Sequence, residues 1–362
     1  MWLRMRMMTT DKQRIAYGDG RDNLNMLLEE AGVRRPFLLC GTSLGRLPCD
    51  DWPIAHAPCF DEIAPNPDIA DVRRAAAAFA ASGCDGIVAM GGGSAMDTAK
   101  GVKAFWKTAP GDEVRGQIAD TGLPLIAIPT TAGTGSESTP FAVIYENGVK
   151  YSVSHPSLLP GYVLLDGKLL KTLPVYQKKC TLLDALCQAI ESHWSRKATA
   201  ESRELAEAAI AGILPEIDSY LSGDDAAAQR MLEAANLAGQ AIALTTTTAP
   251  HAMSYKLTSL YRLPHGHAVA VCLPQVWRYM AAHGDGALQD ELAALSALLG
   301  CGNGAEYMEG LLRRLEIAAP DVRDADMYTL AASVNPQRLS NNPMPLDAAA
   351  LRELYGHVAS FA

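Results

Sequence analysis

The sequence predicts an α/β domain with a parallel sheet followed by an all-α domain, and three observations support this. Short apolar runs alternate with helical patterns over the first half, which is typical of a parallel sheet covered on both faces. Strand signals fade after about residue 165, and helical periodicity follows. The length of 362 residues fits two domains. We therefore expect an α/β domain over 1–165 and a helical domain over 166–362.

The individual elements follow this division. The predicted strands are the apolar runs 36–40, 86–90, 123–128 and 161–167. The predicted helices of the first half are 71–82, which Gly83 ends, and 94–107. In the second half, helical periodicity covers 181–194, 202–214, 225–243, 288–299 and 305–315.

Composition and charge exclude several classes of protein. Hydrophobic residues make up 49% and charged residues 20%, which is ordinary for a soluble globular protein. A net charge of −9 argues against a nucleic-acid partner or an anionic membrane surface. No apolar run approaches the roughly 18 residues that span a membrane. The eight cysteines form no C-x-x-C pair, so we expect reduced thiols and a cytoplasmic location.

Two loops rich in glycine and hydroxyl groups follow predicted strands. The first is GGGSAMDTAK at 91–100, where three glycines lead into a helix whose N-terminal N–H groups favour a pyrophosphate. The second is PTTAGTGSE at 129–137. Ligands bind open α/β sheets at the carboxyl ends of strands, so both loops predict a nucleotide site. Plain glycine or Thr/Gly turns are the alternative, and neither loop has Rossmann or Walker A spacing.

Together, the two loops resemble the iron-containing (group III) alcohol dehydrogenase family, and the similarity runs from IAYGDG near Ile15 to VCLPQVW near Trp277. The resemblance implies an N-terminal dinucleotide domain, a C-terminal helical metal domain and a homodimer. No residue pattern establishes the homodimer. The implied cofactor residues are Gly91, Gly92, Gly93, Ser94 and Asp97 at the pyrophosphate, Thr130, Thr131, Thr134 and Ser136 along the nucleotide, and Lys150 near the ribose.

The type of nicotinamide cofactor depends on the loop after the first strand. Many family members have an Asp there that binds the adenine ribose, whereas this chain has Gly41 and Thr42, which we expect beside the cofactor. A carboxylate would repel a 2′-phosphate, so its absence permits NADPH. Arg46 is close enough in sequence to pair with that phosphate, unless it is a solvated surface residue. We expect NADPH to be accepted, with NADH as the alternative.

The second half contains a candidate metal site. The family binds a divalent ion with an Asp and three His, and Asp184, His251 and His265 match three of these positions. Gln188 stands where the family usually has His, one helical turn after Asp184. Several alternatives stay open: Gln188 ligates directly or through water, Cys187 ligates as a thiolate, or three ligands bind with an added water. In a further alternative, the histidines are merely packed. An Asp/His/Gln site suits both Fe²⁺ and Zn²⁺.

Two other residues of this predicted helix are not expected to ligate. His193 follows Asp184 by nine residues, which turns it to the opposite face of the helix. The same rotation argument counts against Glu191.

Catalytic and substrate residues are expected near these ligands. Tyr255 lies one turn beyond His251 and is the candidate proton donor, with aromatic packing as the alternative. The segments HAMSYKLT and LPHGHAVA resemble the family branch that reduces phosphonoacetaldehyde to 2-hydroxyethylphosphonate. A phosphonate needs cationic or hydrogen-bonding groups. Lys256 and His267 are the candidates for this role, with a surface or capping role as the alternative.

The predicted activity is therefore metal-dependent, NAD(P)H-linked reduction of a small anionic aldehyde, with phosphonoacetaldehyde first. One alternative is a reductase of phosphonopyruvate or of an unphosphorylated short-chain aldehyde. A lyase of the sugar-phosphate cyclase type and a non-catalytic protein that has lost its metal are the others. The segments PTTAGTGSE and HAMSYKLT favour the reductase.

Overall fold

The computed structural model describes residues 13–41, 45, 47–108 and 117–360, and the chain divides into two compact units. The first unit comprises residues 1–173 and 223–232, and the second comprises 174–222 and 233–362. The predicted boundary after residue 165 lies close to the end of the first segment. The expected fold class is confirmed, because the first unit contains a parallel sheet and the second is helical.

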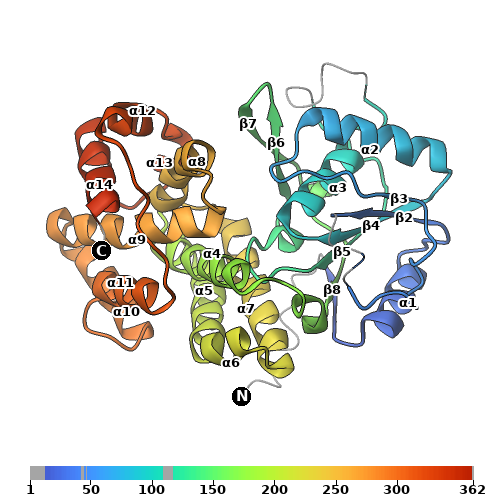
Figure 1. Ribbon diagram of the computed structural model, residues 1–362, viewed down its shortest axis with the longest axis horizontal. Helices are drawn as coiled ribbons and strands as arrows, with labels where there is room; N and C mark the ends of the chain where they lie inside the picture. The colour runs from blue at the N-terminus through green and yellow to red at the C-terminus, as the bar shows by residue number, and fades with distance from the viewer. Residues whose placement is uncertain (1–12, 42–44, 46, 109–116, 361–362) are drawn as a thin grey trace. The chain divides into compact units, whose positions relative to one another are not determined.

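The first unit is built on six parallel strands in the order β1-β8-β5-β4-β2-β3 (Figure 1). Leu38 of β2 pairs with Val88 of β4, which in turn pairs with Ile126 of β5. All three side chains are buried, as expected where helices cover both faces of a sheet. The strands are β1 (Arg14–Tyr17), β2 (Pro36–Cys40), β3 (Cys59–Phe60), β4 (Gly86–Gly91), β5 (Leu125–Pro129) and β8 (Tyr162–Leu165).

Helices cover the two faces of this sheet. Leu24 of α1 belongs to a buried cluster with Leu38, whereas Phe79 of α2 packs edge-on against Phe37, with ring centroids 5.6 Å apart. Adjacent residues of a strand point to opposite faces, so α1 and α2 lie on opposite sides. The remaining elements of the unit are α1 (Gly20–Glu30), α2 (Ile69–Ser82), α3 (Gly93–Phe105) and an antiparallel hairpin of β6 (Phe141–Glu146) and β7 (Val149–Ser154).

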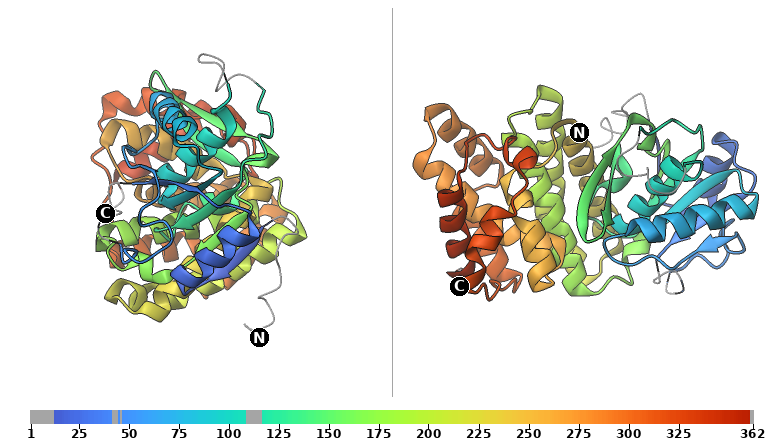
Figure 2. Two further views of the ribbon diagram at one scale, coloured as in Figure 1. Left: turned by 90° about the vertical axis from the view of Figure 1, so that its right-hand side faces the viewer. Right: turned by 90° about the horizontal axis from the view of Figure 1, so that it is seen from above.

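In the second unit, every regular element from Val175 to Ser360 is a helix (Figure 2). Helix α4 is central, with fully buried Leu182, Leu186 and Ile190, and it packs against α5 and α9. The longer helices are α4 (Val175–Trp194), α5 (Ala200–Ile213), α8 (Ala249–Tyr261), α9 (His265–His283), α10 (Gly286–Leu298), α11 (Gly304–Arg314) and α14 (Ala348–Ser360). Helix α7 (Asp225–Thr245) begins in the first unit and continues in the second. The shorter ones are α6 (Ile217–Ser222), α12 (Met327–Ala332) and α13 (Pro336–Leu339). No helix in the described part of the chain is both long and apolar enough to cross a membrane.

Candidate cofactor and metal sites

The two predicted nucleotide loops lie against each other in the first unit. A Cβ atom added to Gly92 would lie 3.3 Å from Cγ2 of Thr131, and one added to Gly93 would lie 3.0 Å from Cγ2 of Thr134. Glycine therefore lets the loop after β4 approach the loop after β5 closely. Ser94 follows in the first turn of α3. The structure thus brings together the residues expected to surround a pyrophosphate.

The first backbone N–H groups of α3 have no side-chain cap, which leaves them able to bind an anion. The N-cap residue of the helix is Gly92, which has no side chain to occupy the first backbone N–H groups. A Cβ on Gly91 would lie 3.7 Å from the backbone nitrogen of Gly41, so the loop after β2 is adjacent as well. Thr130 is anchored here because its N–H donates to the carbonyl of Gly91. Thr42 lies outside the described residues.

A buried lysine holds the second loop in place. Lys100 Nζ donates to the carbonyl of Ser136 at 2.6 Å, to Ser136 Oγ at 2.9 Å, to Thr139 Oγ1 at 3.1 Å and to the carbonyl of Phe141 at 2.7 Å. Burial lowers the pKa of Lys100 to about 8, although the charge of Asp97 opposes this shift. The conformation of the loop therefore depends on a residue that follows the glycines of the first loop.

Asp97 and Ser136, both expected at the cofactor, are bonded to each other. Ser136 Oγ donates to Asp97 Oδ1 at 2.8 Å, and the N–H of Val143 donates to Oδ2 at 3.0 Å. Burial raises the pKa of Asp97, while the charges of Lys100 and Lys150 act in the opposite direction. Lys150 thus lies near the same loop, and Asp97 acts as a support for the loop in this structure.

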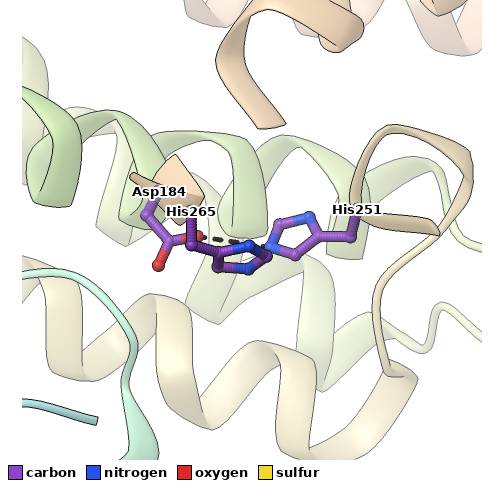
Figure 3. Close-up of side chains that lie close together, drawn as sticks. All are labelled: Asp184, His251 and His265. Carbon is purple, nitrogen blue, oxygen red and sulfur yellow. Dashed lines mark ion pairs between the residues drawn. The ribbon is translucent and has the colours of Figure 1, made fainter. Parts of the chain in front are cut away.

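Three candidate metal ligands converge in the second unit (Figure 3). Asp184 comes from α4, His251 from the first turn of α8, and His265 is the first residue of α9. One ligand atom of each lies within 4.8 Å of the other two. Asp184 and His251 are buried, whereas His265 is half-buried.

The close approach of α4 and α9 depends on a glycine beside His265. A Cβ atom on Gly266 would lie 1.9 Å from the carbonyl oxygen of Cys180 and 2.9 Å from Cβ of Asp184. Only glycine lets the backbone of α9 come this close to α4. The sequence His-Gly at the start of α9 therefore places one ligand directly against the helix that carries another.

Two of the candidate ligand atoms lack the hydrogen bonds that burial normally requires. Asp184 Oδ1 and His251 Nε2 lie 3.3 Å apart, and neither has a hydrogen-bond partner among the described residues. Buried polar atoms are costly when they are unsatisfied. A divalent cation bound to both atoms would remove that cost, so these residues fit a metal such as Fe²⁺ or Zn²⁺.

Gln188 lies at this cluster, as expected from its position one turn after Asp184. Its side chain hydrogen-bonds to Asp184, and its buried Oε1 accepts no hydrogen bond from the described residues. The thiol of Cys187 is completely buried, and burial together with the charge of Glu191 raises its pKa well above the usual value. Burial and the neighbouring carboxylate therefore disfavour the thiolate that ligation by Cys187 would need.

The charges around His251 favour its protonated form in the absence of metal. Burial alone would lower the pKa of His251, but the carboxylates of Glu191 and Asp184 raise it to about 9. Burial acts to raise the pKa of Asp184, yet the ion pair with His251 and the charge of His265 lower it. Two carboxylates thus favour the imidazolium form of His251 when no cation is bound.

Glu191 is a residue of this site that the sequence reasoning missed. It follows Asp184 by seven residues, which is about two helical turns and returns it to the same face of α4. The expectation that Glu191 faces away from Asp184 is therefore wrong, although Glu191 is not among the candidate ligands. Its Oε1 lies 2.5 Å from Nδ1 of His251. His193, by contrast, bonds through Nδ1 to Glu291 at 2.6 Å.

Tyr255 lies next to the candidate ligands. Its ring stacks on that of His265, with centroids 6.0 Å apart and an interplanar angle of 19°. Burial raises the pKa of Tyr255, and the charge of Arg338 and a hydrogen bond with Thr247 partly oppose this shift. The phenol therefore keeps its proton at neutral pH. Arg338 belongs to α13, which packs against α8, and no sequence motif pointed to it.

The two residues expected at the substrate differ in their surroundings. His267 Nε2 donates to the carbonyl of Ala318 at 2.8 Å, and Nδ1 lies 2.8 Å from the hydroxyl of Tyr176. Burial lowers the pKa of His267, so the ring is neutral with both nitrogens engaged. A role toward substrate would require one of these bonds to break. Lys256 is half-buried on α8, directly after Tyr255.

Comparison with known proteins matches both parts of the chain. Residues 12–167 match the family Iron-containing alcohol dehydrogenase, and residues 179–358 match Fe-containing alcohol dehydrogenase family, C-terminal. Probable alcohol dehydrogenase EutG of Escherichia coli (strain K12) is 38% identical over 259 residues, which cover 69% of this chain and 62% of EutG. Phosphonoacetaldehyde reductase of Streptomyces viridochromogenes is 35% identical over 298 residues, which cover 75% of each chain. These identities are similar, so they do not single out the phosphonate branch.

Among solved structures, a similar one is the sulfoacetaldehyde reductase from Bifidobacterium kashiwanohense in complex with NAD⁺. Its TM-score is 0.87 at 26% sequence identity, and the alignment covers 96% of this chain and 97% of that one. The agreement extends over both units of the fold.

Proposed function

The chain belongs to the iron-containing alcohol dehydrogenase family of oxidoreductases, and on this premise we propose that it reduces a short anionic aldehyde, with phosphonoacetaldehyde as the first candidate. The proposed cofactors are NADPH or NADH and a divalent metal, and a homodimer is part of the proposal. The observation that carries it is the pair of buried atoms Asp184 Oδ1 and His251 Nε2, which lie 3.3 Å apart and have no hydrogen-bond partner among the described residues. The family match favours an oxidoreductase over the sugar-phosphate cyclase considered above.

The residues of the two sites can be given separate tasks. A divalent cation bound by Asp184, His251 and His265, with Gln188 Oε1 as a further ligand, would polarise the substrate carbonyl. The nicotinamide would supply the hydride. In the first unit, the backbone around Gly91–Gly93 would bind the pyrophosphate.

Tyr255 supplies the proton that the product oxygen needs. It stacks on His265, and burial keeps its phenol protonated. The proton would move from Oη to the oxygen of the alcohol product.

A cationic group beside these residues supports an anionic substrate. Arg338 belongs to α13, which packs against α8, the helix that carries His251 and Tyr255, and its charge acts on Tyr255. A guanidinium binds phosphonate or sulfonate oxygens through paired N–H donors. Arg338 is therefore a candidate beside the predicted Lys256 and His267, and both ring nitrogens of His267 already have partners.

The position of Arg338 is fixed by Asn341, the second residue after its helix. Asn341 Nδ2 donates to the carbonyls of Thr245 at 2.9 Å and Thr247 at 3.2 Å, which attaches α13 to the loop before α8. Thr246 in that loop has a φ of +61°, which is strained for a β-branched residue. Such strain persists only where surrounding contacts enforce it, so Asn341 holds both the loop and the helix that carries Arg338.

Two relatives support the class of substrate. The phosphonoacetaldehyde reductase and the sulfoacetaldehyde reductase are named for two-carbon aldehydes that carry a strongly anionic group. The shared chemistry is a tetrahedral oxyanion that one methylene group separates from a carbonyl. Because one name contains a phosphonate and the other a sulfonate, an experiment must decide which of these groups the substrate of this chain carries.

Steady-state oxidation of NADPH and of NADH tests the proposal directly. Phosphonoacetaldehyde, sulfoacetaldehyde and neutral propionaldehyde would be compared on protein stripped of metal and reloaded with Fe²⁺ or Zn²⁺. We expect kcat/KM to be at least about tenfold higher for an anionic aldehyde than for propionaldehyde, because one charge-assisted bond contributes about 1.5–3 kcal/mol. Activity that survives complete metal removal, or equal rates with the neutral aldehyde, would contradict the proposal.

The Arg338→Met variant tests the recognition of the anion. We expect KM for the anionic aldehyde to rise about 10- to 100-fold, while KM for propionaldehyde changes little. The Lys256→Met variant is the matched comparison from the same site, and a smaller effect is expected. An unchanged ratio of the two KM values in Arg338→Met would exclude Arg338 from substrate recognition.

A further inference from the structure

We propose that Glu191 is a positioning residue that fixes the tautomer of His251, so that Nε2 is presented to the divalent metal. The inference rests on the metal-dependent function proposed above. Glu191 lies on α4 between the candidate ligand Asp184 and the end of the helix, and it is completely buried. A buried carboxylate needs hydrogen-bond donors around it, and the identity of those donors carries the argument.

The two carboxylate oxygens of Glu191 have different partners. Oε1 lies 2.5 Å from Nδ1 of His251. Oε2 accepts the backbone N–H of Thr248 at 2.6 Å and the hydroxyl of the same residue at 2.8 Å. Thr248 is the residue that precedes α8, so Glu191 binds α8 at its first turn, where His251 lies.

The direction of the Thr248 hydroxyl is set by a third residue. Trp194 Nε1 donates to Thr248 Oγ1 at 2.9 Å, and an indole nitrogen can only donate. The Thr248 hydroxyl proton is therefore directed to Glu191 Oε2. Because Oε2 receives two donors, Oε1 remains for the Nδ1–H of His251.

A proton on Nδ1 leaves the lone pair of a neutral His251 on Nε2. This is the atom that lies 3.3 Å from Asp184 Oδ1 and has no hydrogen-bond partner among the described residues. Metal-binding histidines generally donate their other N–H to a carboxylate, carbonyl or water, which fixes the ring and strengthens the ligand. Glu191 meets this requirement, and its negative charge adds to that of Asp184 near the cation.

The second histidine is arranged in a similar way with a neutral partner. His265 Nδ1 lies 3.5 Å from Ser254 Oγ, whose hydroxyl proton is given to the carbonyl of His251 at 2.8 Å. The Ser254 oxygen is therefore available as an acceptor for Nδ1–H of His265. In both histidines Nδ1 faces an acceptor, but only His251 has a charged one.

The isosteric variant Glu191→Gln should reverse the tautomer. The N–H and hydroxyl of Thr248 are both donors, so the amide oxygen of the new side chain must face Thr248. Its NH₂ group then faces His251 Nδ1, which has to accept and moves the ring proton to Nε2. A protonated Nε2 cannot ligate, although the size and shape of the side chain are unchanged.

Binding of Co²⁺ and Zn²⁺ to metal-stripped protein provides the test. We expect the dissociation constant of Glu191→Gln to rise about 10- to 100-fold over that of the wild type, with an altered visible spectrum of bound Co²⁺. Glu291→Gln is a matched control, because Glu291 makes the same contact with Nδ1 of a histidine, His193, at 2.6 Å. That control should bind metal as the wild type does.

A measurement on the wild type keeps the proposal testable if Glu191→Gln does not fold. In ¹⁵N spectra of the Zn²⁺-loaded protein, Nδ1 of His251 should be protonated and Nε2 bound to metal; the opposite assignment would overturn the proposal. Equal Co²⁺ affinity and spectra in folded Glu191→Gln and wild type would also overturn it, while leaving the proposed function intact. If the wild type binds neither ion, the proposed metal-dependent function fails together with this inference.

Discussion

Oδ1 of Asp184 and Nε2 of His251 lie 3.3 Å apart in the interior of the second unit, and neither atom has a hydrogen-bond partner among the described residues. Each belongs to a residue otherwise well provided with contacts, since Gln188 bonds to Asp184 and Glu191 bonds to His251. Asp184 Oδ1 and His251 Nε2 are therefore the atoms that would bind a cation. Their proximity leads to predictions about proton release and metal affinity.

The first prediction concerns pH and metal affinity. In the metal-free chain, the carboxylates of Glu191 and Asp184 overcome the effect of burial and raise the pKa of His251 from 6.5 to about 9. Metal needs an unprotonated Nε2, so binding below pH 9 must release a proton. The apparent dissociation constant for Co²⁺ should therefore rise about tenfold for each pH unit as pH falls from about 8 to about 6.

Titration calorimetry in two buffers of different ionisation enthalpy measures that proton. The same pKa shift stabilises the metal-free fold below about pH 6.5, and this contribution is lost as pH rises through about 9. Metal binding without release of a proton at pH 7 would contradict the protonated state assigned to His251.

The second prediction concerns the position where the family usually has a third histidine. Gln188 is buried beside Asp184, and an amide oxygen is a weaker ligand than imidazole for Fe²⁺ or Zn²⁺. Gln188→His should therefore tighten Zn²⁺ binding about tenfold, as measured by competition with a chelator. Gln289→His, on the exposed surface of α10, is the control and should leave the affinity unchanged. Weaker binding in Gln188→His would show that the site is built around the amide.

Much of the fold could be predicted because its signals are local. The strand at 86–91 and the helix at 225–245 follow directly from apolar runs and helical periodicity. The β6–β7 hairpin was missed although Asn147 and Gly148, both with positive φ, carry a strong turn signal. Helices α8 and α9 were also missed, because polar ligand segments and Pro274 interrupt their periodicity.

The candidate site was predicted less completely because its parts depend on tertiary contacts. Asp184, His251 and His265 matched a family pattern, and the structure brings them together. Glu191 could have been placed on the correct face by counting two helical turns, but its bond to His251 depends on how α8 packs. Arg338 lies far along the chain from Tyr255, so sequence spacing contains no information about their proximity.

The third prediction concerns the glycine between α4 and α9. A methyl group at Gly266 would collide with the carbonyl of Cys180, which belongs to a buried helix and cannot move aside. Gly266→Ala should lower the free energy of unfolding by about 3 kcal/mol and weaken metal binding, because His265 is displaced. Chemical denaturation measures the first effect. Gly310→Ala on α11, where a Cβ meets nothing within 4 Å, should instead be neutral or slightly stabilising.

The fourth prediction concerns the lysine beneath the cofactor loop. Lys100→Met removes the hydrogen bonds of Nζ to four acceptors and one of the two positive charges that act on Asp97, so we expect a loss of about 3 kcal/mol in stability. The dissociation constant of NADPH should also rise, since Ser136 and Thr139 lose their anchor. Thermal unfolding and fluorescence titration of NADPH measure these effects. Lys171→Met, which breaks an exposed pair with Asp225, should change neither.

The fifth prediction concerns the proton donor. An acid must carry its proton to act, so the rate of aldehyde reduction should fall as pH rises through the pKa of Tyr255, which burial raises above its ordinary value. Tyr255→Phe keeps the ring stacked on His265 but removes the proton. We expect kcat to fall about 10- to 100-fold, with water as the replacement donor, and the alkaline limb of the pH–rate profile to disappear. Tyr328→Phe, at an exposed position on α12, is the control and should leave the profile unchanged. If Tyr255→Phe also kept the wild-type profile, Tyr255 would be an aromatic packing residue and water would be the donor in the wild type as well.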